Sequence, residues 1–171
     1  DFNSKHIAVS TLFNTENAGY PKGNNQGVVA AKGEYILFLN SDVLIKDVNW
    51  DDLMSYMDSN SKVGALTVRV MLPTGEMDKA SHRGFPTVWN AFSYYSGLEK
   101  VTRNMPILNR YFGGYHLTHK RLTEVHEIDS PSGAFFLTRK TIMDAIGGFD
   151  ETFFMYGEDI DLSYRIIKAG Y

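Results

Sequence analysis

Apolar and polar positions follow one another along the chain in a regular order of shorter and longer segments. Three short apolar runs rich in β-branched residues predict buried strands over residues 7–13, 34–39 and 63–70. The stretches between them, residues 24–31 and 49–58, have the apolar spacing of helices. This alternation predicts an α/β domain whose mostly parallel sheet is covered by helices.

The pattern weakens in the middle of the chain, from residue 71 to about residue 126, where proline and glycine recur. A long region of weak periodicity inside a compact domain is usually a functional loop or lid. One helix is expected within it, over residues 87–95. Five aromatic residues there are interpreted as packing, with the lining of a binding site as the alternative: Trp89, Tyr94, Tyr95, Tyr111 and Tyr115.

Regular structure is expected again towards the end of the chain. Residues 134–138 predict a strand, and residues 140–146 predict a helix that stops at the pair Gly147-Gly148. The sequence contains no internal repeat, so a single domain over residues 1–171 accounts for all the predicted elements.

Composition excludes several classes of protein. The net charge is −3 without a basic stripe, so nucleic-acid binding is not expected. No apolar stretch reaches the roughly 18 to 20 residues that span a bilayer, so no transmembrane segment is expected. The absence of cysteine excludes disulfides, thiol catalysis and zinc–thiolate sites. These features fit a cytoplasmic enzyme domain.

The most informative segment is residues 147–165, GGFDETFFMYGEDIDLSYR, which places five carboxylates among aromatic residues. Carboxylates beside a hydrophobic wall are poorly solvated and need a cation, a hydrogen-bonding partner or a proton. The segment leads into a predicted helix on which Ile160, Tyr164 and Ile167 are expected to face the core. A helix N-terminus explains one or two of the acids but not the whole cluster.

Residues 17–27 form a second polar segment, rich in asparagine and glycine. Glycine lets the backbone approach a ligand closely, and the free N–H groups of a following helix attract anions. Asparagine side chains can recognise a nucleobase or a ribose through hydrogen bonds. Taken alone, the segment is better explained as a turn before an ordinary helix.

A third polar segment, Asn40-Ser41-Asp42, directly follows the predicted strand at residues 34–39. It places a carboxylate at the carboxyl end of a parallel strand, where open α/β sheets bind ligands. Mg²⁺ and Mn²⁺ prefer such hard oxygen ligands, although taken alone the segment is better explained as a helix or turn cap after a strand. Four histidines do not form a recognisable metal motif and are expected to be solvated or to line a cleft: His82, His116, His119 and His126.

Together the three segments resemble the family 2 glycosyltransferases, inverting enzymes of the GT-A fold that use nucleotide-sugar donors, and above all the rhamnosyltransferase-like members. The resemblance implies a GT-A-type, Rossmann-like α/β fold that lacks its N-terminal strand, as an internal part of a longer family pattern. It implies that Asp42, with Asn40 in the first position of the family's Asp-x-Asp motif, binds a divalent metal ion. It also implies that Asp159 is the general base and that Glu158 orients it or touches the acceptor. The residues implied to bind the donor are Asn17, Gly19, Asn25, Gly27, Asn40 and Asp42.

The implied activity is transfer of a sugar, with Mn²⁺ or Mg²⁺ as cofactor, from a nucleoside-diphosphate sugar to a hydroxyl of a saccharide or lipid-linked acceptor in polysaccharide biosynthesis. The implied location is the cytoplasm, with peripheral association at the inner face of the membrane left open. Two alternatives remain at this point: a degenerate, non-catalytic sugar-binding domain and a sugar-nucleotidyltransferase. The latter needs a glycine-rich, basic triphosphate loop, which the first part of the sequence does not contain.

Overall fold

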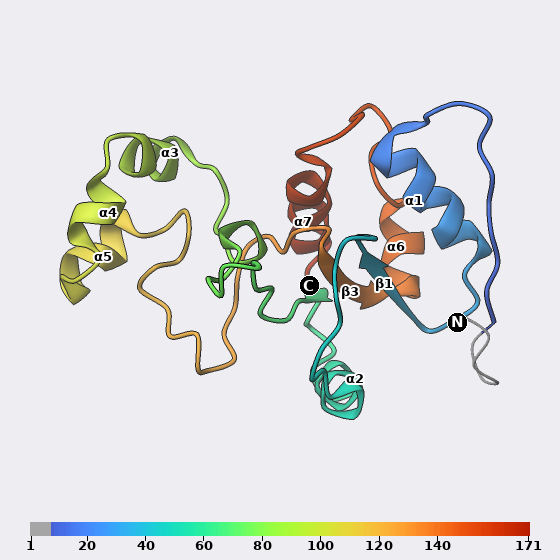
Figure 1. The fold of residues 1–171 in the computed structure, drawn as a ribbon, viewed down its shortest axis with the longest axis horizontal. Helices are drawn as coiled ribbons and strands as arrows, with labels where there is room; N and C mark the ends of the chain where they lie inside the picture. The colour runs from blue at the N-terminus through green and yellow to red at the C-terminus, as the bar shows by residue number, and fades with distance from the viewer. Residues whose placement is uncertain (1–7) are drawn as a thin grey trace.

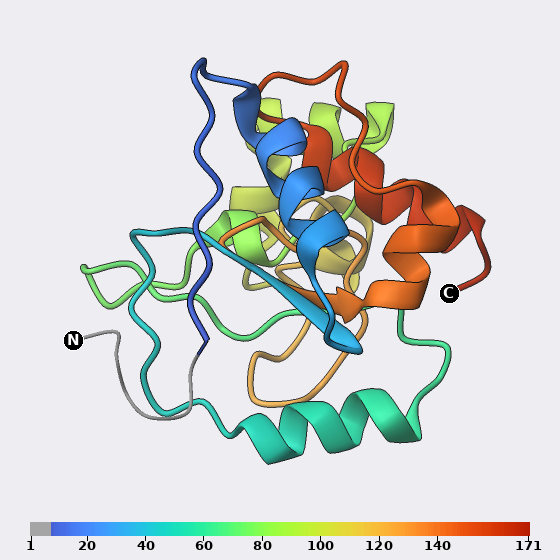
Figure 2. The same ribbon diagram turned by 90° about the vertical axis from the view of Figure 1, so that its right-hand side faces the viewer.

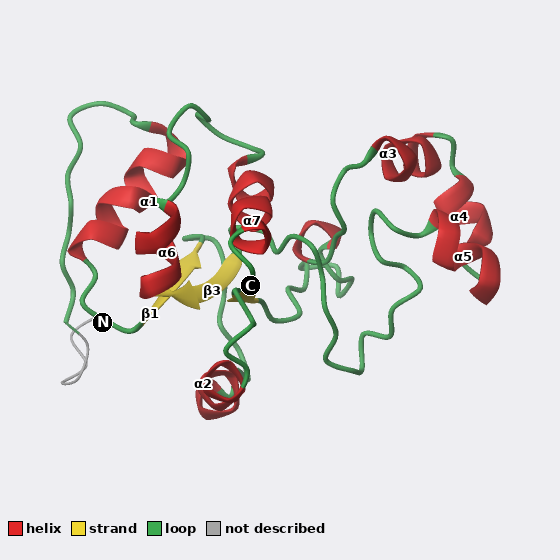
Figure 3. Ribbon diagram, turned by 180° about the vertical axis from the view of Figure 1, so that it is seen from behind, coloured by secondary structure: helices red, strands yellow, loops and turns green. Residues whose placement is uncertain are grey.

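A computed structural model describes residues 8–171, which form a small sheet between two layers of helices (Figures 1 and 3). Within these residues the sheet has three strands, β1 (Tyr35–Leu39), β2 (Ala65–Leu66) and β3 (Phe135–Arg139). One face is covered by α1 (Gly19–Ala30), α6 (Lys140–Ile146) and α7 (Glu158–Lys168), and the other by α2 (Trp50–Ser59). The predicted α/β class with helices on both faces is confirmed.

Alternation along the strands builds the two layers of core. Ile36 and Phe38 of β1 and Phe136 of β3 point towards α1, α6 and α7 and pack around Phe149 and other buried side chains there. Their neighbours in sequence point the other way, where Phe135 and Leu137 pack against Met57 of α2. Because both faces are covered, β3 is buried along most of its length, which explains its continuous apolar run.

The strand directions differ from the prediction of a mostly parallel sheet. β3 lies between β1 and β2 and is antiparallel to both, with Tyr35 opposite Arg139 and Leu66 opposite Leu137. Only β1 and β2 run in the same direction. After β2 the chain makes a long excursion and enters β3 at the edge where β1 and β2 end, so β3 must run back against them. No sequence pattern distinguishes that return from a parallel crossover.

The strand predicted at residues 7–13 is not present in the described part, residues 8–13 (residue 7 lies outside it). This stretch is exposed, with Phe13 91% accessible, and in Figures 1 and 2 it runs along the outside of α1. A strand needs a backbone partner, and the described part of the chain pairs nothing with the second edge of β1. The strand predicted at residues 63–70 is shorter in the structure. Its backbone also lacks partners over most of its length, because only Ala65 and Leu66 pair with β3.

The observed helices agree better with their predicted bounds than the strands do, because the sequence signals that start and end a helix are local. The predictions for α2 and α6 are confirmed, and α6 ends at Gly147, which adopts a left-handed conformation with φ of 78°. α1 begins at Gly19, five residues before its predicted start. Within residues 8–171 no helix is both long and apolar enough to span a membrane.

We call the sheet with its covering helices α1, α2, α6 and α7 the sandwich. A group of short helices projects from the sandwich at one end of the molecule, well away from the sheet (Figures 1 and 3). It contains α3 (Val88–Tyr95), α4 (Leu98–Thr102) and α5 (Pro106–Phe112), which pack on one another. A 3-10 turn, η1 (Lys79–Ser81), precedes it in the chain. Only α3 was expected, and Thr87 caps it by accepting a hydrogen bond from the backbone of Asn90 at 3.1 Å. We call residues 86–121 the helical lobe.

Helix α7 is rotated relative to the predicted orientation. Its buried stripe consists of Glu158, Leu162 and Ile166, whereas Tyr164 and Ile167 are exposed and Ile160 is half-buried. The prediction that Ile160, Tyr164 and Ile167 face the core is therefore wrong. The predicted and the observed buried stripes both have helical spacing. The sequence favours the predicted stripe as the buried one, because the observed stripe contains an acid. The rotation turns Glu158 inward, and this determines the chemistry at the start of α7.

Candidate active site

The carboxyl end of β1 and the start of β3 meet at one edge of the sheet. The backbone N–H of Asn40 donates to the carbonyl of Ala134 at 3.4 Å, and Asp42 follows on an exposed turn. Among the described residues, the chain offers no hydrogen-bond donor to the Asp42 carboxylate. Asp42 therefore lies at the edge predicted for it and faces solvent.

Residues 147–165, which contain five carboxylates, are called the acidic segment below. The N-terminus of α1 packs against the loop of this segment that precedes α7. Asn17 accepts a hydrogen bond from the backbone N–H of Gly19 at 3.0 Å, and the N–H of Tyr20 donates to the carbonyl of Phe154 at 2.9 Å. Gly19 has φ of 79°, and a Cβ at this position would lie 2.6 Å from the Phe154 carbonyl oxygen. Glycine is thus required here by the close approach of two segments of the chain.

Tyr20 joins this helix to both neighbouring segments, a role that the sequence did not reveal. Its hydroxyl donates to the carbonyl of Gly133 at 3.3 Å, just before β3. Burial, together with the nearby carboxylates of Glu158 and Asp159, raises the pKa of Tyr20 to about 12. Residues 17–27, the segment before β3 and the loop that leads to α7 therefore meet at one tyrosine.

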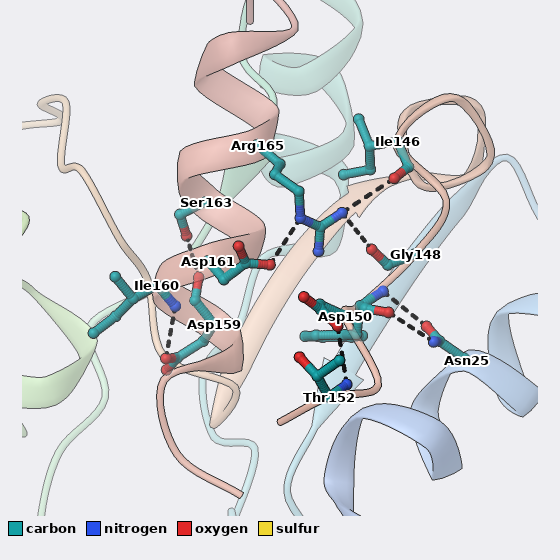
Figure 4. Close-up of polar contacts among 11 residues, drawn as sticks. Asn25, Ile146, Gly148, Asp150, Thr152, Asp159, Ile160, Asp161, Ser163 and Arg165 are labelled. Atoms are coloured by element: carbon teal, nitrogen blue, oxygen red, sulfur yellow. Dashed lines mark hydrogen bonds and ion pairs between the residues drawn. The ribbon is translucent and has the colours of Figure 1, made fainter. Parts of the chain in front are cut away.

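Asn25 holds the glycine turn that opens the acidic segment (Figure 4). Its side-chain oxygen accepts from the N–H of Phe149 at 2.8 Å, and its amide nitrogen donates to the carbonyl of Phe149 at 2.9 Å. The same nitrogen donates to Glu151 at 3.0 Å. These contacts give Asn25 a structural task, and its implied contact with the donor stays a prediction. Gly27, two residues later, is exposed on the same helix with open space where a Cβ would lie.

Four of the five carboxylates in the acidic segment have partners within the chain, and Figure 4 shows those of Asp150 and Asp161. Asp150 accepts from the N–H of Thr152 at 2.9 Å, which lowers the pKa of Asp150, and Glu151 accepts from Asn25. Asp161 pairs with Arg165 at 2.7 Å, and ion pairs between residues four apart are common on helices. Arg165 also donates to the carbonyls of Ile146 and Gly148 and so helps Asn25 to fix the glycine turn. Asp159 has the fourth partner, described below.

Arg83 pairs with Asp159 across the site, and sequence reasoning did not find it. Their guanidinium and carboxylate groups lie 2.5 Å apart, and both side chains are 14% exposed. The other oxygen of Asp159 accepts from the N–H of Ile160 at 2.8 Å. Arg83 is held by an antiparallel bridge to Ser130, whose hydroxyl lies 3.3 Å from that of Ser163 on α7. The pair joins residues 76 positions apart, so no local pattern could indicate it.

Glu158 is the carboxylate without a partner. It is 7% exposed, and its Oε2 is buried with no hydrogen-bond partner among the described residues. Burial raises the pKa of Glu158, and the neighbouring Asp159 carboxylate raises it further, against the opposing effects of nearby backbone N–H groups and of Arg83. Adjacent acids in one helical turn are thus in very different environments, a feature typical of functional sites.

The histidines lie outside this arrangement. Nε2 of His82 lies 2.6 Å from Nε2 of His126, and His116 pairs with the buried Glu99 at 2.6 Å. His82 is buried, so of the two expectations, solvation and the lining of a cleft, solvation is wrong for this residue. Among residues 8–171, no three histidine or carboxylate side chains are grouped so that they could hold a metal ion.

The residues at the end of β1 nevertheless fit the divalent ion that the resemblance implies. Asp42 is exposed and unpaired, and the side chain of Asn40 adds a second hard oxygen in the same turn. Mg²⁺ and Mn²⁺ sites at diphosphates commonly use one or two protein oxygens, with phosphate oxygens and water as the other ligands. A site with a single carboxylate is consistent with that mode and not with a cage built entirely of protein ligands.

An open, apolar groove of about 490 Å³ runs beside the start of α7. Its lining includes Phe85 and Phe153, together with Ile160, Asp161 and Tyr164 of α7. The rings of Phe85 and Tyr164 meet edge to face with centroids 6.0 Å apart. Ile160 and Tyr164, two of the residues predicted to face the core, therefore line a surface groove.

Replacement of Gly148 by alanine should destabilise the fold by about 1–3 kcal/mol. Gly148 has φ of 73°, and a Cβ there would lie 2.5 Å from the side-chain oxygen of Asn25. The matched control is Gly27→Ala in the open interior of α1, which should stabilise the protein by about 0.5–1 kcal/mol. Urea unfolding of the two variants measures both effects. Equal stability of Gly148→Ala and the parent protein would show that the contacts of Asn25 do not constrain this turn.

Glu158→Gln should raise the melting temperature at neutral pH. The raised pKa of Glu158 means that the folded state binds its proton more tightly than the unfolded state. This group therefore lowers stability as pH rises from its ordinary pKa of 4.5 through its raised pKa. The advantage of the variant should disappear below that window. Melting curves between pH 4 and pH 8 test this, and a constant difference at every pH would contradict it.

Comparison with known proteins shows sequence similarity to sugar-transferring proteins. Residues 3–171 match the family model described as glycosyltransferase like family 2. The O-antigen biosynthesis protein RfbC of Myxococcus xanthus is 28% identical over 153 residues, which cover 88% of this chain and 11% of RfbC. The pre-mycofactocin glycosyltransferase of Mycobacterium tuberculosis is 28% identical over 171 residues, 99% of this chain and 31% of that protein.

Rhamnosyltransferase WbbL of Escherichia coli K12 is also 28% identical, over 163 residues that cover 89% of this chain and 55% of WbbL. The chain thus spans between 11% and 55% of the length of these three relatives. No solved structure matches it.

Proposed function

Because the chain belongs to the glycosyltransferase-like family 2, we propose that it transfers a sugar from a nucleoside-diphosphate sugar to a hydroxyl of a saccharide or lipid-linked acceptor, with inversion at the anomeric carbon. The observation that carries the proposal is the convergence of the three polar segments. The backbone of Asn40 contacts Ala134 just before β3, and the hydroxyl of Tyr20 donates to Gly133 in the same segment. The N–H of Tyr20 donates to Phe154 in the loop that leads to Glu158 and Asp159. Segments far apart in sequence thereby meet at one edge of the sheet.

Asp159 is the general base in this proposal. As the acceptor oxygen forms its bond to the anomeric carbon, the bond from that carbon to the diphosphate oxygen breaks and its electron pair leaves with the diphosphate. The acceptor proton passes to the Asp159 carboxylate, whose oxygens each retain a lone pair beyond those used by Arg83 and Ile160. A carboxylate is a weak base for a sugar hydroxyl, so the proton moves late, when bond formation has made the hydroxyl acidic.

Arg83 and Glu158 assist without touching the reacting atoms. Arg83 fixes the carboxylate of Asp159 in one orientation, since its guanidinium approaches from the opposite wall of the site. Glu158 lies on the buried side of the same helical turn and orients its neighbour. A divalent ion held by Asp42, with Asn40 beside it, would neutralise the negative charge that develops on the departing diphosphate.

The groove beside α7 is the proposed acceptor site. Its lining includes Gly157 and Ile160, which flank Glu158 and Asp159 in the sequence, and its aromatic side chains offer flat apolar faces on which a sugar ring can stack. The names of the relatives direct the choice of donor, because WbbL is a rhamnosyltransferase and RfbC is an O-antigen biosynthesis protein. Rhamnosyl or hexosyl transfer in polysaccharide biosynthesis is therefore proposed, in the cytoplasm or at the inner face of the membrane.

The test is nucleoside diphosphate release from a panel of nucleotide-rhamnose and nucleotide-hexose donors, with Mn²⁺ and a saccharide acceptor, using the whole protein. Release that depends on both the acceptor and one donor is expected. Donor binding without turnover across the panel would instead support a non-catalytic sugar-binding domain. Formation of pyrophosphate from a sugar phosphate and a nucleoside triphosphate would support a nucleotidyltransferase.

A further inference from the structure

The helical lobe exposes an unusual amount of apolar surface. Val88 is 90% exposed, Tyr95 is 85% exposed and Ile107 is 77% exposed. Monomeric proteins rarely leave contiguous apolar patches uncovered unless these bind a partner, a ligand or a membrane. The interpretation of the aromatic residues in this region as packing is wrong for Tyr95 and Tyr111, whose side chains face solvent.

The exposed side chains of the lobe form one surface. Val88, Phe92 and Tyr95 share a face of α3, and Ile107 and Tyr111 share a face of α5. Trp89 joins the two helices: its ring packs against Phe112, with centroids 5.4 Å apart, and its Nε1 donates to the carbonyl of Tyr111 at 2.7 Å. The two helices also pack directly on each other, so both exposed faces belong to one compact group of helices.

The charge of the lobe is opposite to that of the chain as a whole. Residues 86–121 contain five lysines and arginines and a single acid, in a chain with net charge −3. The acid, Glu99, is buried and paired with His116. Arg121 pairs loosely with Glu124 at 3.5 Å. Within the described residues the other cations have no carboxylate partner: Lys100, Arg103, Arg110 and Lys120.

We propose that the helical lobe binds the surface of a membrane that contains anionic lipids. Exposed tyrosine, tryptophan and aliphatic side chains suit the boundary between lipid headgroups and acyl chains, and unpaired lysines and arginines suit anionic headgroups. A second copy of the chain is a poorer occupant, because two lobes with the same excess of positive charge repel each other.

The position of the lobe gives this binding a consequence for access to the groove. The lobe joins the sandwich through Phe85, Pro86 and Thr87, which also line the groove beside α7. Docking of the lobe would therefore bring the groove close to the membrane, where a lipid-linked acceptor is held. The vesicle binding itself does not rest on the proposed transferase activity, because it needs neither donor nor acceptor.

Sedimentation with vesicles tests the proposal, using phosphatidylcholine alone and phosphatidylcholine mixed with phosphatidylglycerol. The whole protein should bind the anionic vesicles, and added salt should weaken binding. The double variant Lys100→Glu, Arg110→Glu should bind at least roughly tenfold more weakly, since each cation near the surface contributes separately. Tyr95→Ser with Ile107→Ser should also reduce binding, through loss of apolar insertion.

Matched controls lie on the sandwich, far from the lobe in sequence. Lys32→Glu with Lys46→Glu makes the same change in net charge, and Val29→Ser removes an apolar side chain that is 84% exposed. The controls should retain vesicle binding. Equal loss in controls and lobe variants would overturn the proposal, as would a lack of binding by a folded parent protein. Self-association that the lobe variants abolish, without vesicle binding, would assign the surface to a protein interface instead.

Discussion

Asp159→Asn is expected to reduce sugar transfer by about 10²- to 10⁴-fold at saturating donor and acceptor, because it removes the group that accepts the proton of the acceptor. The amide keeps the size of the side chain and can still accept from the N–H of Ile160, so the start of α7 should stay in place. Donor affinity should change little. Single-turnover kinetics with the preferred donor measure the chemical step directly.

Asp144→Asn is the matched control for that variant. Asp144 is also an aspartate in an ion pair, with Lys140 at 2.7 Å, but it lies on α6 and does not line the groove. This control should lose little stability and little turnover. Near-normal turnover in Asp159→Asn, together with a collapse in Glu158→Gln, would make Glu158 the base. That alternative has a structural basis, because Oε2 of Glu158 is buried without a hydrogen-bond partner among the described residues.

The elements that could be predicted from sequence are those whose signals are local. β1, α2, α6 and the residues that cap them depend on neighbours within one or two turns of the chain. The direction of β3 and the missing partner for residues 8–13 depend on where distant segments return, which composition and periodicity do not encode. The family was nevertheless identified, since three short motifs in order are more specific than any single element.

The candidate site shows the same division. The motifs indicated Asn25, Asp42 and the acidic pair, but not the tasks that tertiary contacts give them. Asn25 clamps a turn more than a hundred residues away, and Arg83 reaches Asp159 from a region without clear periodicity. The face of α7 was misjudged because burial of an acid is unfavourable on average. In this protein the acid Glu158 is buried all the same, whereas its neighbour Asp159 is paired with Arg83.

Asp42→Asn is expected to abolish the metal-dependent part of nucleotide binding. A bound divalent ion contributes several kcal/mol of charge stabilisation, so affinity in Mn²⁺ should fall by more than about 100-fold. The fold should be unaffected because Asp42 is exposed and accepts no hydrogen bond from the described part of the chain. Calorimetry with nucleoside diphosphate, in Mn²⁺ and in chelator, separates the metal-dependent component.

Asp51→Asn provides the comparison for the same experiment. Asp51 is an equally exposed carboxylate nine residues further along, in the first turn of α2, and it lies outside the edge where the polar segments converge. Both variants remove one negative charge, so a general effect of charge on a diphosphate would appear in both. Loss of Mn²⁺-dependent affinity in Asp42→Asn alone would identify a ligand. Equal affinity of the parent protein in Mn²⁺ and in chelator would exclude a metal ion at this edge of the sheet.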